Sequence, residues 1–216
     1  VHMLDLALHL LGEPELISVS AATYSELAGR GNWGNTMPTV FAGNGTNTPQ
    51  TLSPDDDKLN DWITSFERSK TIIIYFGVHT GVETGGKFEP ILYLGGGRHI
   101  TAGRLFTALA AKLSDKKVVV ILDPGRSPPS PLTGQMTCDF ASRLKNDPLV
   151  REAIRACPQL VVMVGTQAGE QAWECEELQT TAFGNAIMRG LKGHAEAETG
   201  SQISARTLFE YAQKYT

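Results

Sequence analysis

The chain has 216 residues, of which 22 are Gly and 11 are Pro, with 41% hydrophobic and 19% charged residues and a net charge of −4. This length suffices for one domain with a sizeable buried core. The chain has no basic stripe of the kind that nucleic-acid binding requires, so we exclude nucleic acid as a partner. The longest apolar runs, at residues 118–122 and 160–164, are too short to cross a bilayer, so we expect no membrane partner.

The cysteines point to a reducing compartment. Cys138, Cys157 and Cys175 cannot all pair within one chain, and no basic-then-apolar signal peptide opens the sequence. We therefore expect a cytoplasmic protein. Because the chain begins at Val1 within a helix-like stretch, we also expect it to be a fragment or an incomplete gene model.

The first fifty residues differ in composition from the rest. Residues 2–11 have a helix-like pattern that Gly12 stops, and residues 16–24 alternate between apolar and small polar positions. That alternation predicts a half-buried strand. Residues 29–52 are rich in Gly, Asn, Thr and Pro, which is typical of a loop or linker.

From Ser53 onward the hydrophobic periodicity is strong. Ser53 and Pro54 predict a helix start, and the helix that follows carries an apolar face of Leu59, Trp62, Ile63 and Phe66. Residues 71–78 (TIIIYFGV), 117–123 (KVVVILD) and 159–164 are β-branched and apolar runs, which predict strands buried on both faces. Residues 91–94 predict a shorter strand.

Amphipathic helices alternate with these runs. Thr101 caps one predicted helix, the stretch between Cys138 and Cys157 is more weakly helical, and residues 180–191 and the stretch after Ser204 predict two more. The last two are expected to bury, respectively, Phe183, Ile187, Met188 and Leu191, and Leu208, Tyr211, Ala212 and Tyr215. The fold class is therefore α/β, with a mostly parallel sheet covered by helices on both faces.

Ligands of such sheets bind at the carboxyl ends of the strands, and two candidate residues stand there. His79 follows the first buried strand in GVHTG, and its ordinary pKa of about 6.5 suits general acid–base chemistry. A loop histidine satisfied by the backbone is the alternative for this residue. Asp123 ends the second buried strand and is expected at the same edge of the sheet.

These motifs resemble those of the caspase/metacaspase-type cysteine peptidases. Bacterial and fungal members read YFSGHG at the histidine and ILDACHSG at the nucleophile, where this chain reads YFGVHTG and ILDPGRSPP. The resemblance continues through LVVMVGTQAGEQAWE to the last helix and spans residues 54–216. It implies a caspase-like three-layer sandwich and cleavage of peptides, with a peptide or protein as the partner and no cofactor or metal.

The resemblance assigns roles to three positions. His79 matches the catalytic histidine, which takes the thiol proton and later protonates the leaving amine. Asp123 matches an acidic residue that shapes the pocket for a basic side chain of the substrate. Gly125 occupies the nucleophile position and has no side chain that attacks. Ser127 and Cys138 are the candidate substitutes, and both lie displaced along the chain.

A second resemblance covers the start of the chain. VHMLDLALHLLGEPELISVSAATY is similar to the beginning of the C-terminal domain of glucose–fructose oxidoreductase-like (Gfo/Idh/MocA) dehydrogenases, with His2 and Asp5 on the pattern. The sequence has no strand followed by G-x-G-x-x-G, so we reject hydride transfer as the activity. The strand of residues 16–24 is a candidate to replace the first strand of the peptidase sheet.

We therefore expect an oxidoreductase-like segment at 1–28, a linker or loop at 29–52 and a caspase-like domain at 53–216. Three functions stay open. The first is a cysteine endopeptidase acting after basic residues, and the second is an inactive pseudopeptidase that binds peptides or regulates. The third is a non-functional dehydrogenase fragment fused to the peptidase-like part.

Overall fold

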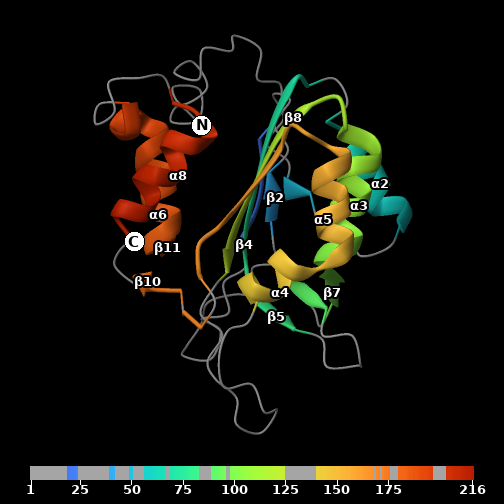
Figure 1. Ribbon diagram of the computed structural model, residues 1–216, viewed down its shortest axis with the longest axis horizontal. Coiled ribbons are helices and arrows are strands. Elements are labelled where there is room, and N and C mark those ends of the chain that lie inside the picture. The colour runs from blue at the N-terminus through green and yellow to red at the C-terminus, as the bar shows by residue number, and fades with distance from the viewer. Residues whose placement is uncertain are drawn as a thin grey trace, which may run out of the picture.

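A central sheet with helices on both faces forms the body of the molecule (Figure 1). The computed structural model describes residues 19–23, 39–41, 49–50, 56–66, 69–82, 89–95, 98–124, 140–167, 169–170, 172–175, 180–196 and 203–216. The helix predicted at 2–11, with His2 and Asp5, and the positions Gly125, Ser127 and Cys138 lie outside these residues.

The main sheet has six strands in the order β3-β2-β1-β4-β8-β9. Its parallel part consists of β1 (Val19–Thr23), β4 (Thr71–Val78), β8 (Lys117–Pro124) and β9 (Leu160–Val164). Two short antiparallel strands, β2 (Thr39–Phe41) and β3 (Pro49–Gln50), extend it beyond β1. The α/β class and the strands predicted at residues 71–78, 117–123 and 159–164 are thus confirmed. Burial on both faces does not hold for β9, the outermost of these strands, where Val161 is 40% exposed.

The N-terminal strand belongs to this same sheet. β1 pairs in parallel with β4 along its whole length, from Val19 opposite Ile73 to Thr23 opposite Gly77. The strand predicted at residues 16–24 therefore does occupy a sheet position. β2 and β3 lie inside the 29–52 segment, which was predicted to be a loop or linker from its composition. That segment therefore contributes strands as well. They form by pairing with β1 and with each other, and no hydrophobic run marks them in the sequence.

The helices divide unequally between the two faces. One face carries α2 (Asp56–Thr64), α3 (Ala102–Leu113), α4 (Phe140–Asn146) and α5 (Pro148–Ala156), and the other carries α6 (Ala182–Arg189) and α8 (Ala205–Lys214) (Figure 1). A five-residue π-helical turn, Gly190–His194, continues α6. The parallel strands β1, β4, β8 and β9 follow one another in the sheet in the same order as in the sequence. Right-handed connections between strands arranged in this way all place their helices on the same face of the sheet. Among the described residues, the second face is therefore covered by the helices that come after β9.

Alternation along the strands builds a separate core on each face. Ile72, Ile74 and Phe76 of β4 pack with the α2–α5 helices in the larger core. Tyr75 and its neighbour Ile73 contact the smaller core under α6 and α8. The predicted apolar face of α2 is buried throughout, with Leu59, Trp62, Ile63 and Phe66 at most 5% exposed.

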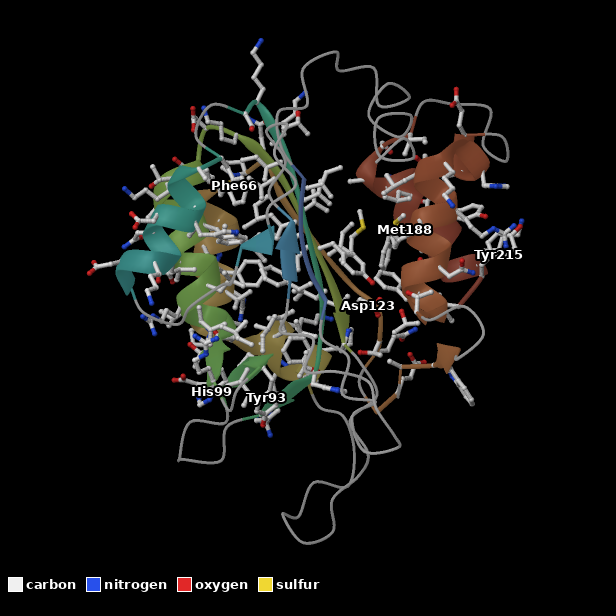
Figure 2. The ribbon with its side chains drawn as sticks, turned by 180° about the vertical axis from the view of Figure 1, so that it is seen from behind. Phe66, Tyr93, His99, Asp123, Met188 and Tyr215 are labelled. Atoms are coloured by element: carbon white, nitrogen blue, oxygen red, sulfur yellow. The ribbon has the colours of Figure 1, made fainter. Side chains whose placement is uncertain are left out.

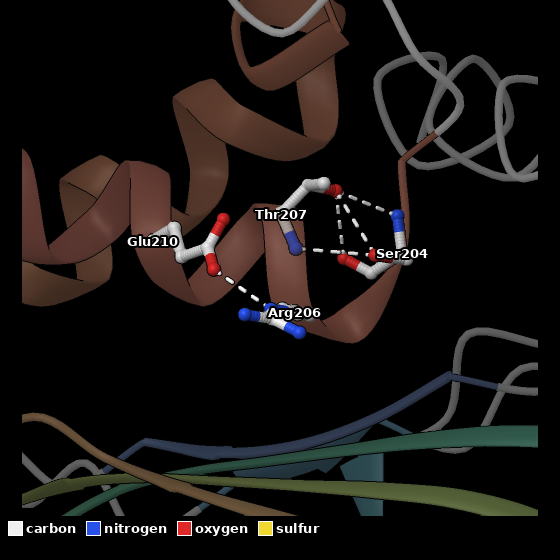
Figure 3. Close-up of polar contacts among 4 residues, drawn as sticks. All are labelled: Ser204, Arg206, Thr207 and Glu210. Carbon is white, nitrogen blue, oxygen red and sulfur yellow. Dashed lines mark hydrogen bonds and ion pairs between the residues drawn. The ribbon is translucent and has the colours of Figure 1, made fainter.

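The helix starts follow the sequence closely. Thr101 caps α3 through the Arg104 N–H, as predicted. Ser204 caps α8 in a reciprocal capping box with Thr207 (Figure 3). One turn further on, Arg206 and Glu210 form an exposed ion pair at 2.8 Å, which adds little to stability because water screens it.

Two inward positions predicted for the last helices are wrong. Met188 is 39% exposed and Tyr215 is 44% exposed. Both residues lie at the carboxyl ends of their helices: Met188 is in the last turn of α6, and Tyr215 is the C-cap residue that follows α8. Phe183, Ile187, Leu208 and Ala212 are buried as predicted.

Two small antiparallel sheets lie outside the main one. The first pairs β5 (Thr80–Val82), β6 (Pro90–Gly95) and β7 (Arg98–Thr101), and the second pairs β10 (Glu174–Cys175) with β11 (Thr180–Thr181). Only β6 was predicted. The first sheet follows directly on the carboxyl end of β4, and β11 of the second leads into α6. Both sheets lie near the end of the main sheet where the candidate residues are found (Figure 1).

No helix among the described residues is long and apolar enough to cross a membrane.

Candidate functional site

The carboxyl ends of β4 and β8 lie side by side. The strands pair in parallel over eight positions, ending with Gly77 opposite Asp123 and Val78 opposite Pro124. His79 follows β4 directly, and Gly125 is the next residue of the sequence after β8. The two described candidates therefore meet at one edge of the sheet, as the sequence predicted, while Gly125 lies outside the described residues.

His79 marks the point where the chain leaves the main sheet for the first small one. Its carbonyl accepts the Tyr93 N–H at 2.9 Å, which ties the end of β4 to β6. Its side chain is half-buried. A histidine held by the backbone at a strand end meets the positional requirement for acid–base chemistry, but position alone does not separate that role from a structural one.

Asp123 is buried at the end of β8, where it is 2% exposed. Figure 2 shows it at the lower end of the sheet, on the side of α6. Its Oδ2 atom accepts hydrogen bonds from the Tyr75 hydroxyl and, at 2.6 Å, from the Thr181 hydroxyl. Hydrogen bonds to an ionised acceptor are roughly twice as strong as neutral ones, so this carboxylate joins β4, β8 and the start of α6.

The network continues into the backbone of α6. Thr181 is the N-cap residue of this helix, and its hydroxyl also accepts the Gly184 N–H at 2.8 Å. A carboxylate bonded to the capping hydroxyl stands at the positive end of the helix dipole, which favours its negative charge. Burial and the Asp123 carboxylate together raise the pKa of the Tyr75 phenol well above its ordinary value, so Tyr75 acts as a permanent donor here.

Gly184 lets the helix approach this network closely. A Cβ atom at Gly184 would lie 2.6 Å from both the Asp123 Oδ2 and the Tyr75 hydroxyl and 2.7 Å from the Thr180 hydroxyl. Such distances are far below van der Waals contact. Only a glycine at this position allows α6 to begin directly on the carboxylate.

Neither Tyr75 nor Thr181 was recognised as a site residue from the sequence. They lie 48 and 58 positions from Asp123 along the chain, and both were assigned to ordinary elements. The one available signal was the tyrosine inside TIIIYFGV, because a buried tyrosine hydroxyl usually requires a partner.

Cys157 cannot supply the absent nucleophile. Its thiol is 1% exposed and lies 3.5 Å from the Leu113 carbonyl at the end of α3, where β8 begins. This is the edge of the sheet opposite to Asp123. Burial raises the pKa of the thiol, which opposes formation of a thiolate. Cys157 is therefore a small buried residue of the larger core, and the side chain of Cys175 lies outside the described residues.

Tyr93 and His99 border the same edge from the other face (Figure 2). Their rings stand edge to face with centroids 6.3 Å apart, and Tyr93 is 39% exposed. A Cβ atom at Gly81 would meet the Tyr93 ring at 3.1 Å, so the ring covers the residues that follow His79.

Among the described residues no group of three or more His, Cys, Asp or Glu side chains is arranged to hold a metal ion. Comparisons of the chain with protein-family models, with curated proteins and with solved structures gave no match.

Proposed function

We propose that this chain is a caspase-like pseudopeptidase: a domain that binds a peptide bearing a basic side chain at the carboxyl ends of β4 and β8 and does not cleave it. The observation that carries the proposal is the strand pairing. It brings the ends of β4 and β8 together, so that His79 and Asp123 share one edge while the sequence position after Pro124 is a glycine.

Hydrolysis by a cysteine peptidase needs a thiolate within hydrogen-bond reach of its histidine. Gly125 offers no side chain, and Cys157 is buried at the opposite edge of the sheet. His79 and Asp123 remain at this edge of the sheet as groups to position a peptide. The resemblance of residues 54–216 supports a peptide as the ligand, and the Asp123 carboxylate supports a basic side chain on it.

An assay of the full chain and two variants tests this function. The substrates are fluorogenic peptides with Arg or Lys before the scissile bond, and the matched control peptide has Gln there. We expect no turnover by the unmodified chain and tighter binding of the basic peptides in fluorescence anisotropy. Gly125→Cys is expected to gain turnover that thiol reagents abolish, and Gly125→Cys/His79→Ala is expected to lose it.

Two outcomes would overturn the proposal. Thiol-sensitive turnover by the unmodified chain would show an active cysteine peptidase with another nucleophile. Equal binding of the Arg and Gln peptides, with no gain of activity in Gly125→Cys, would show that this edge of the sheet is not a peptide site.

A further inference from the structure

One oxygen of the Asp123 carboxylate is already fully used within the protein. An ionised carboxylate accepts hydrogen bonds only, through about two lone pairs on each oxygen. At Oδ2 the Tyr75 hydroxyl donates one hydrogen bond and the Thr181 hydroxyl, at 2.6 Å, donates another. A basic group of a ligand can therefore bond to Oδ2 only if it displaces one of these two hydroxyls.

The surrounding structure holds both hydroxyls in place. The Thr181 hydroxyl also accepts the Gly184 N–H at 2.8 Å, as the N-cap of α6, so turning it away from Asp123 would disturb the start of the helix. The Tyr75 ring packs against the smaller core under α6. The start of α6 also covers Oδ2 closely, because a Cβ atom at Gly184 would lie 2.6 Å from it. A ligand is therefore expected to reach the carboxylate from the side of Oδ1.

The two basic side chains of peptides place different demands on such a carboxylate. The guanidinium of Arg is planar and makes its strongest contact through two parallel N–H bonds, one to each carboxylate oxygen. The ammonium of Lys is a compact charge at the end of an unbranched stem and needs no second oxygen. Because Asp123 is only 2% exposed, a slim stem with a terminal charge also reaches it more easily than a planar fork does.

We propose that this edge of the sheet selects a peptide bearing Lys over one bearing Arg. Tyr75 and Thr181 are the positioning residues for this selectivity, and they act through Asp123. The inference rests on the proposed function, since it specifies which basic side chain the same site accepts.

The selectivity follows from the hydrogen bonds that each ligand keeps or loses. A Lys ammonium bonds to Asp123 at Oδ1 and leaves both hydroxyls on Oδ2. An Arg guanidinium that bonds to both oxygens displaces the hydroxyl of Tyr75 or Thr181. An Arg guanidinium that bonds to Oδ1 alone gives up the second of its two parallel bonds. In either case the Arg complex has one fewer hydrogen bond to a charged group, and such bonds are the strong ones.

Fluorescence anisotropy with the full chain measures this selectivity directly. The three labelled peptides are identical except for Lys, Arg or Gln at one position. We expect the unmodified chain to bind the Lys peptide about tenfold more tightly than the Arg peptide, which corresponds to one hydrogen bond to a charged group. Both basic peptides are expected to bind more tightly than the Gln peptide, because both carry the charge that Asp123 attracts.

Two variants test the part of the hydroxyls. Tyr75→Phe leaves one lone pair of Oδ2 open, so that a guanidinium can bond to both oxygens. We expect tighter binding of the Arg peptide and nearly equal dissociation constants for the Arg and Lys peptides. Thr181→Ala opens the other lone pair and is expected to change the ratio in the same direction. Tyr215→Phe is the matched control, because it removes the hydroxyl of an exposed tyrosine that lies apart from Asp123 (Figure 2), and it is expected to keep the tenfold ratio of the unmodified chain.

The outcomes separate this inference from the proposed function. If the unmodified chain bound the Lys and Arg peptides equally, and both more tightly than the Gln peptide, the selectivity would be overturned and the proposed function would stand. Selectivity for Lys that both variants retained would overturn the roles of Tyr75 and Thr181. If neither basic peptide bound more tightly than the Gln peptide, the proposed function would be overturned and this inference with it. Far-ultraviolet circular dichroism checks the fold of each variant, and a merely structural loss would weaken all three peptides without equalising Lys and Arg.

Discussion

Replacing Tyr75 with Phe tests whether the Asp123 network holds α6 on the sheet. The change removes one of the two hydroxyls that donate to Asp123 Oδ2 and keeps the ring that packs under α6. A hydrogen bond to a charged group contributes about 1.5–3 kcal/mol to stability. Because the carboxylate is only 2% exposed, water cannot easily replace the lost donor. We expect the free energy of unfolding to fall by about 2 kcal/mol.

Urea unfolding at pH 7, followed by far-ultraviolet circular dichroism, measures this loss. With a slope of about 2 kcal/mol per molar urea, the midpoint is expected to fall by about 1 M. Thr181→Ser is the matched control, because serine keeps the hydroxyl that donates to Asp123 and accepts the Gly184 N–H. It is expected to cost less than about 0.5 kcal/mol. A loss below that value in Tyr75→Phe would refute the role assigned to the network.

The same residue makes stability depend on alkaline pH. The pKa of Tyr75 is raised in the folded state above its ordinary value of 10.0, so above pH 10 the unfolded chain releases a proton that the folded chain retains. The contribution of Tyr75 to the free energy of unfolding is therefore fully present below pH 10. Above pH 10 it falls by about 1.4 kcal/mol per pH unit. Tyr75→Phe is expected to lack this part of the slope. Parallel pH profiles of the two proteins would contradict the assignment.

Three further predictions concern the packing of α6, the cap of α8 and the buried thiol. Gly184→Ala is expected to lower the free energy of unfolding by more than about 2 kcal/mol, because its Cβ would lie 2.6 Å from Asp123 Oδ2. Gly103→Ala is expected to cost less in the same urea titration, because its Cβ would meet no atom closer than the end of the Leu149 side chain at 3.0 Å, with Asp147 Oδ1 at 3.3 Å. Ser204→Ala is expected to cost about 1 kcal/mol through loss of the α8 cap, and a neutral result in thermal unfolding would contradict that. In a chain with Cys138 and Cys175 replaced by Ser, the buried Cys157 thiol is expected to react with a thiol-specific dye only at the rate of unfolding, so fast labelling under native conditions would refute its placement.

Much of the fold follows from local pattern. The β-branched runs predicted β4, β8 and β9, and the capping hydroxyls Thr101 and Ser204 marked the starts of α3 and α8. These elements could be predicted because an apolar β-branched run and a capping hydroxyl are each visible in the residues of the element itself. Short strands are different. β2 and β10 have three and two residues, and they exist only through partners elsewhere in the chain.

The place of the candidate site in the sheet could be predicted from the sequence, but the side-chain contacts within it could not. The rule that ligands gather at the carboxyl ends of parallel strands placed His79 and Asp123 at one edge. The partners of Asp123 could not follow from that rule, because Tyr75 and Thr181 reach it from elements far along the chain. The need for glycine at position 184 likewise arises only when α6 meets the ends of β4 and β8.

The structural role of Asp123 is separable from the role that we propose for it in peptide binding. As the acceptor for Tyr75 and Thr181 it fastens the start of α6, and both of these donors are neutral hydroxyls that stabilise its charge without cancelling it. The proposed recognition of a basic peptide depends on that charge rather than on the donors. Asp123→Asn is therefore expected to abolish the preference for an Arg peptide over the Gln peptide in fluorescence anisotropy. Tyr75→Phe is expected to lower stability and to keep the preference, measured well below its urea midpoint. If Tyr75→Phe lost the preference while remaining folded, the charge of Asp123 would not be the determinant of binding, and the peptide would have to be recognised through the geometry of α6 instead.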